Sequence, residues 1–97
     1  MITHIVLFKL KDRSSGSVGK ARDVLLGMRG KIPQLRHLEV GVDILHSQRS
    51  YDIVLITKFD SLEELQAYQA HPVHVEVAEY MTSVREFAGT VDYESEL

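Results

Sequence analysis

Apolar residues recur along the chain with two different periods, and the change of period predicts the secondary structure. Alternating or nearly continuous apolar runs, typical of strands, occupy residues 3–11, 38–44, 51–59 and 87–93. Residues 17–32 and 61–86 instead place apolar side chains three and four positions apart, which is the spacing of amphipathic helices. The predicted order of elements is therefore β-α-β-β-α-β.

Helix-boundary residues agree with this order. Ser17 is a candidate N-cap for the first helix, and Pro33 lies beyond its end. Ser61 and Glu64 have the spacing of a capping box at the start of the second helix. Pro72 breaks that helix, because proline disfavours a helical residue before it but suits the first turn of a new helix.

This order of elements predicts an α+β fold of the ferredoxin-like type, an antiparallel sheet with both helices on one face. The 97 residues form a single domain, 1–97. We expect the sheet face without helices to carry Ile5, Leu7, Ile53, Leu55 and Val91. A soluble monomer rarely exposes such a patch, so we predict a homodimer in which two sheets pack face to face.

Composition excludes several classes of function. The net charge is −3 and the basic residues are scattered, which argues against a nucleic-acid partner. There is no cysteine for zinc, iron–sulfur or thiol chemistry. No apolar run approaches the roughly 20 residues of a membrane span, and the start lacks a signal-peptide pattern. We therefore expect a cytoplasmic protein that has no membrane partner.

One short segment concentrates titratable groups in an otherwise apolar setting, and it reads Tyr68-Gln69-Ala70-His71-Pro72-Val73-His74. Imidazole titrates near neutral pH, so His74 is a candidate general base and Tyr68 a candidate supporting donor. Strand alternation places His4 and Asp52 on the helix-facing side of the sheet. The sequence therefore predicts a ligand-binding pocket lined by His4, Asp52, Tyr68 and His74.

Other interpretations of the same segment stay open. The four groups can form a buried hydrogen-bonded cluster that only fixes the broken helix, because buried polar groups nearly always find partners. His71 precedes Pro72 and suits an N-cap or a surface position. A metal site using His71 and His74 would need further converging ligands. We predict neither a metal nor a cofactor.

Several segments together resemble one family, the stress-responsive α/β-barrel (Dabb) domain. They are residues 4–9, 51–55, 59–61, 68–74 and 91–93. The resemblance covers nearly the whole chain and implies a ferredoxin-like protomer that forms a dimeric α+β barrel. Most members of the family have no assigned activity, so it implies a Dabb protein of unassigned biochemical role, with self-association and a small apolar ligand.

The family also includes a plant polyketide cyclase, olivetolic acid cyclase, which needs no cofactor. The resemblance makes His74 the counterpart of its catalytic histidine and Tyr68 that of its supporting tyrosine. His4 also matches, whereas Asp52 stands where the cyclase has a pocket histidine. A cyclase, isomerase or lyase with His74 as base is therefore the alternative function, and a structural stress protein without any ligand is a third.

Overall fold

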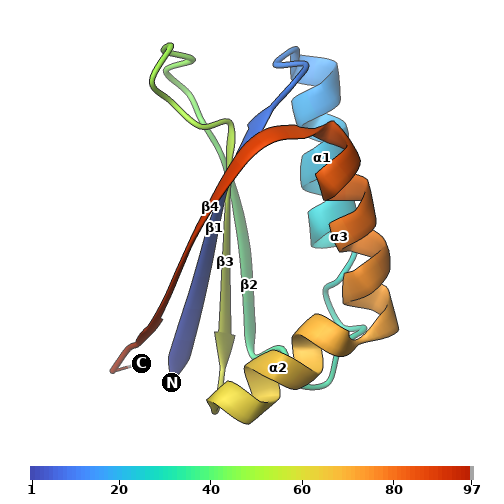
Figure 1. Ribbon diagram of the computed structural model, residues 1–97, viewed down its shortest axis with the longest axis vertical. Helices are drawn as coiled ribbons and strands as arrows, with labels where there is room; N and C mark the ends of the chain where they lie inside the picture. Colours follow the sequence, from blue (N-terminus) through green and yellow to red (C-terminus); the bar gives the residue numbers. More distant parts are fainter. Residues whose placement is uncertain (97) are drawn as a thin grey trace.

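The chain folds into an antiparallel sheet that is covered by helices on one face only (Figure 1). The computed structural model describes residues 1–96. Its elements are β1 (Ile2–Leu10), α1 (Ser15–Leu26), β2 (His37–Val42), β3 (Ile53–Phe59), α2 (Leu62–Ala70), α3 (Pro72–Val84) and β4 (Arg85–Glu94). The predicted β-α-β-β-α-β order is confirmed, with the second helix divided into α2 and α3. None of the helices in residues 1–96 has the length and apolarity that a membrane crossing requires.

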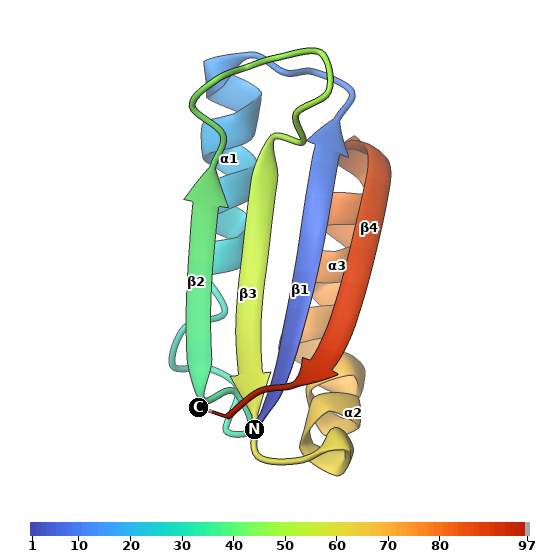
Figure 2. The same ribbon diagram turned by 90° about the vertical axis from the view of Figure 1, so that its left-hand side faces the viewer.

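The sheet has the order β2-β3-β1-β4, so β1 lies between β3 and β4 (Figure 2). Residues that stand opposite one another on neighbouring strands share a face of the sheet. His4 stands opposite Thr57 on β3 and Asp92 on β4, and Val6 stands opposite Leu55 and Thr90. All of these residues therefore belong to the face that carries the helices.

The hydrophobic core lies between this face and the helices. Its largest fully buried side chains include Tyr68, Phe59, Leu25 and Met28. The expectation that Ile53 and Leu55 lie on the open face was wrong, because they are only 2 % and 3 % exposed and belong to the core. The strand is apolar on both faces, so its alternation alone does not tell which set faces the helices. The open face does carry the expected Ile5, Leu7 and Val91, and Val54 and Ile56 of β3 join them.

The first helix begins and ends earlier than the apolar spacing indicates. Ser14, not Ser17, is its N-cap, and the Ser14 hydroxyl accepts a hydrogen bond from the Ser17 amide at 3.3 Å. The helix ends at Leu26, and the chain then turns through Gly30, whose φ of 77° lies in the left-handed region. Met28 is nevertheless completely buried, so the apolar spacing marked a core position rather than helix.

The caps of α2 and α3 agree with the sequence. The Ser61 hydroxyl accepts a hydrogen bond from the Glu64 amide at 3.2 Å, which confirms half of the predicted capping box. His71 is the N-cap of α3, where its Nδ1 accepts the Val73 amide at 3.1 Å, and Pro72 follows in the first turn. The ring of His71 thereby caps the start of α3, while its backbone amide donates to the Tyr68 carbonyl at the end of α2.

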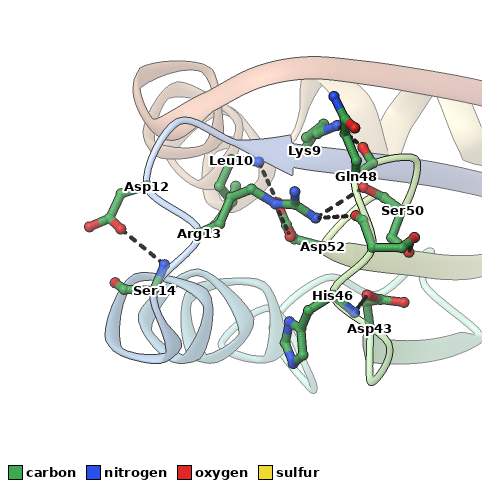
Figure 3. A network of polar contacts seen from close by, with 11 residues as sticks. Lys9, Leu10, Asp12, Arg13, Ser14, Asp43, His46, Gln48, Ser50 and Asp52 are labelled. Atoms are coloured by element: carbon green, nitrogen blue, oxygen red, sulfur yellow. Dashed lines mark hydrogen bonds and ion pairs between the residues drawn. The ribbon is translucent and has the colours of Figure 1, made fainter.

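Asp52 fastens the β2–β3 loop to the end of β1 (Figure 3). Its side chain is buried, and it accepts hydrogen bonds from the Leu10 amide and the Arg13 Nε, both at 2.8 Å. Arg13 also donates to the carbonyl oxygens of Ser47 and Ser50. The loop arches over the end of β1 in Figure 2, and this network holds it there.

Asp52→Ala should therefore destabilise the fold, by about 3 kcal/mol, because it leaves a buried amide and a half-buried guanidinium without their acceptor. Chemical denaturation monitored by circular dichroism measures the change in free energy of unfolding. Asp23→Ala is the matched control: it breaks the exposed Arg22–Asp23 pair and should cost less than about 0.5 kcal/mol. Equal losses in the two variants would contradict the structural role of Asp52.

Candidate functional site

A cavity of about 250 Å³ lies between the helix-bearing face of the sheet and helices α2 and α3. Its wall is mostly apolar, as is usual for small-molecule sites. The apolar part of the wall consists of Val6, Phe8, Leu25, Met28, Leu55, Val77, Ala78, Met81 and Ala88. The polar part includes His4, Tyr68, Gln69, His74, Thr82, Arg85 and Thr90.

Three aromatic rings from three different elements form a row in this wall. The ring centroids of Tyr68 and His74 are 4.4 Å apart, and those of His4 and Tyr68 are 6.4 Å apart with the rings edge to face. Tyr68 lies in the last turn of α2, and the break at Pro72 turns the chain so that His74 in α3 meets it. His4 reaches the row from β1 because it lies on the helix-bearing face.

His74 presents an unprotonated ring nitrogen at neutral pH. Its Nδ1 lies 3.0 Å from the carbonyl oxygen of Gln69, which can only accept, so Nδ1 carries the hydrogen and Nε2 keeps its lone pair. Burial lowers the pKa of His74 below its ordinary value of 6.5; the Gln69 carbonyl opposes this, and the charge of His4 lowers the pKa further. The neutral imidazole of His74 is therefore the main form at and above pH 6.5.

Tyr68 is completely buried, yet its hydroxyl has a weak partner. The hydroxyl donates to the sulfur of Met28 at 3.8 Å, and a thioether is a poor acceptor. Burial raises the pKa of Tyr68 well above its ordinary value of 10.0, so the phenol stays protonated. Its O–H is consequently a donor that a better acceptor in the cavity would engage.

His4 has a carboxylate partner that sequence reasoning did not select. Its Nδ1 donates a hydrogen bond to the Asp92 carboxylate, which can only accept, so the neutral ring carries its hydrogen on Nδ1. The contact depends on the register that sets His4 opposite Asp92. Alternation along residues 87–93 places Asp92 on one face of the strand, but only the pairing with β1 reveals that this is the face of His4.

The structure brings together three of the four predicted pocket residues. His4, Tyr68 and His74 line the same cavity, whereas Asp52 does not. Asp52 precedes β3 by one residue, and Thr57, which stands opposite His4, lies five residues further on. That separation is about 16 Å at the rise of an extended strand. Alternation misplaced Asp52 because the same phase wrongly set Ile53 and Leu55 on the open face.

Metal-ligating side chains do not converge at this row. Within residues 1–96 no group of three or more His, Cys, Asp or Glu side chains is placed to hold a metal ion. His71 and His74 are three residues apart, but the His71 Nδ1 caps α3 and the His74 Nδ1 donates to Gln69. The chemistry that the row offers is hydrogen bonding and proton transfer.

Comparison with known proteins places the chain among structurally similar domains. The Passiflora edulis hydroxynitrile lyase has a TM-score of 0.83 over 99 % of this chain and 94 % of its own, and its 16 % identity shows the fold alone. A dimeric protein of unknown function with a ferredoxin-like fold from Bacteroides fragilis is 29 % identical, with a TM-score of 0.82 over 97 % of this chain and 95 % of its own. The ferredoxin-like fold is thus confirmed.

Sequence similarity identifies the family. The Arabidopsis thaliana stress-response A/B barrel domain-containing protein DABB1 is 34 % identical over 99 % of this chain. The chain spans about half of that relative's length, 48 %. The model of the Stress responsive A/B Barrel Domain (Dabb) matches residues 2–95, nearly the whole chain. The chain therefore belongs to the stress-responsive A/B barrel (Dabb) domain family.

Proposed function

We propose that this Dabb domain binds a small, largely apolar molecule in the cavity between the sheet and the helices. The observation that carries the proposal is the Tyr68 hydroxyl, which is buried beside a cavity of about 250 Å³ and whose only acceptor among residues 1–96 is a sulfur atom. Buried hydroxyls normally have an oxygen or nitrogen partner. An oxygen atom of a ligand supplies that partner here.

The polar groups around the cavity complement an alcohol or a carbonyl compound. The Tyr68 O–H donates, and the His74 Nε2, unprotonated because Nδ1 serves Gln69, accepts. A ligand hydroxyl satisfies both groups at once, while the apolar wall holds a hydrocarbon chain or ring. A purely structural cluster would instead have saturated the hydrogen bonds of Tyr68 and His74 within the protein.

A second candidate is an enzyme in which His74 is the general base. The specific observation is the fixed tautomer of His74 together with its lowered pKa, which keep Nε2 available as a base near neutral pH. The Tyr68 hydroxyl then stabilises a developing enolate oxygen. The fold also carries a hydroxynitrile lyase, but that likeness extends to the fold alone, so this candidate rests on His74.

We also propose that a second copy of the chain covers the open face of the sheet. Four large apolar side chains there are strongly exposed: Leu7 at 38 %, Tyr93 at 45 %, Phe87 at 57 % and Val91 at 60 %. A contiguous apolar patch on a small domain is typical of an interface. The similar protein from Bacteroides fragilis is described as dimeric, which supports the same assembly.

Ligand binding is tested with hexan-1-ol as a neutral probe, followed by NMR titration. Tyr68→Phe should weaken binding about fivefold, because one hydrogen bond of roughly 1 kcal/mol is lost. Its free energy of unfolding should stay within about 0.5 kcal/mol of wild type, since only a sulfur contact disappears. Tyr80→Phe, which lies outside the cavity, is the matched control. Failure of wild type to bind the probe, or equal effects of the two variants, would refute the pocket.

Proton abstraction is tested by following deuterium exchange next to the carbonyl of hexan-2-one in D₂O. The neutral imidazole is the base, so the exchange rate should rise with pH through a pKa below 6.5 and then level off. His74→Gln should abolish the catalysed exchange, whereas His46→Gln, in the exposed β2–β3 loop, should leave it unchanged. Exchange that survives in His74→Gln would remove this residue as the base.

Dimerisation is tested by sedimentation equilibrium at micromolar concentration. Val91→Asp introduces a charge into the exposed apolar patch of the open face and should convert the wild-type dimer to a folded monomer, with half the mass. Val75→Asp is the control, because Val75 is also exposed, at 42 %, but lies on α3. A wild-type protein that sediments as a monomer would overturn the proposal, as would a Val91→Asp variant that stays dimeric.

A further inference from the structure

Arg85 is a half-buried cation that lines the cavity without a partner. It stands at the junction of α3 and β4, and its backbone amide caps the helix by donating to the Met81 carbonyl. Its guanidinium makes no hydrogen bond or ion pair with any other residue in the part of the chain that the structure describes, residues 1–96. Five N–H donors are therefore available beside an apolar space.

An irregularity in the sheet puts this cation, and not a carboxylate, on the cavity side. Lys9 stands opposite Phe87, so an unbroken register would set Glu86 opposite Leu10. The register shifts between Lys9 and Leu10, and Arg85 takes the place opposite Leu10 instead. Glu86 is left exposed and outside the cavity wall. A bulge of this kind changes the direction of side chains, and here it places a positive instead of a negative side chain on the cavity side of the sheet.

The surroundings of Arg85 leave its charge uncompensated. The cavity wall contains no aspartate or glutamate within the described residues. The Asp92 carboxylate, which contacts the wall residue His4, already accepts a hydrogen bond from that ring. The carbonyls of Ser83 and Val84 at the end of α3 are taken by Lys11. A guanidinium in such a setting pairs best with a planar anion that accepts two parallel N–H bonds.

We propose that Arg85 recognises the carboxylate of a small monocarboxylic acid whose apolar body fills the cavity. The proposal rests on the ligand binding proposed above and adds the chemical class of the ligand. One guanidinium matches one carboxylate, and the apolar wall between Arg85 and the Tyr68–His74 pair matches a short hydrocarbon segment. Tyr68 and His74 remain free for a second oxygen function of the same molecule.

The experiment compares hexanoate with hexan-1-ol, which has the same chain without the charge, by NMR titration at pH 7.5 and low salt. Wild type should bind hexanoate about tenfold more tightly, because hydrogen bonds to charged groups are the stronger ones. Arg85→Gln should abolish that preference and leave hexan-1-ol binding within about twofold. Arg85→Lys keeps the positive charge but loses the paired N–H donors of the guanidinium, so it should retain part of the preference for hexanoate. Salt should weaken hexanoate binding only.

Arg22→Gln is the matched control, since it removes an arginine charge from the exposed surface of α1. Equal affinity of wild type for the two probes would overturn the assignment of Arg85 while leaving the pocket intact. The assignment of Arg85 is also overturned if Arg85→Gln lowers the stability but keeps the preference for hexanoate. The positive charge of Arg85 would then only stabilise the negative C-terminal end of the α3 helix dipole. Binding of neither probe would overturn the pocket and the assignment together. If Arg85→Gln does not fold, Arg85→Lys and the salt dependence of wild type decide.

Discussion

The antiparallel pairing of β1 with two neighbours fixes what the other elements face. β1 lies inside the sheet, so each of its residues from Ile2 to Phe8 is aligned with one residue on β3 and one on β4. A shift of one residue would turn the core set outward, because side chains alternate between the faces. This pairing sets His4 beside Asp92, buries Val6 against the helices and leaves Ile5 on the open face. Both the cavity and the exposed patch follow from it.

The second constraint is the break at Pro72, which separates α2 from α3 and brings Tyr68 and His74 together. An unbroken helix would place residues 68 and 74 about 9 Å apart along its axis, on different faces. The turn at His71 brings the rings of Tyr68 and His74 to 4.4 Å. The same turn gives the Gln69 carbonyl to the His74 Nδ1, which fixes the tautomer. One proline thereby determines both the position and the protonation of the candidate base.

The sequence predicted the features that depend on local patterning. Pro72 and the apolar spacing around it located Tyr68 and His74, and alternation placed His4 on the helix-bearing face. The features that depend on pairing between distant strands escaped it. Ile53 and Leu55 were assigned to the wrong face because β3 is apolar on both sides. Nothing in the local sequence identifies Asp92 or Arg85 as a site residue. The position of Asp92 follows from the register of β4 against β1, and that of Arg85 follows from the bulge in this register.

The prediction for Asp52 failed together with the one for Ile53 and Leu55, because the alternation that put those two residues on the open face also put Asp52 on the helix-facing side. Asp52 lies one residue before β3, where its carboxylate is taken by Leu10 and Arg13 (Figure 3). Its burial is real, but it serves the β2–β3 loop and not the cavity. A buried acid in a strand-like run is thus ambiguous between a pocket and a loop anchor until its partners are known.

The cavity and the open face lie on opposite sides of one sheet, and this separation has a consequence for function. His4 faces the cavity and Ile5 faces the patch, so neighbouring residues of β1 belong to the two surfaces. A partner seated on the patch therefore covers no residue of the Tyr68–His74 row. It would instead lie against β1 and β4, the strands that carry His4, Asp92 and Arg85. The surfaces proposed for assembly and for ligand binding are thus distinct in location, although β1 and β4 contribute residues to both.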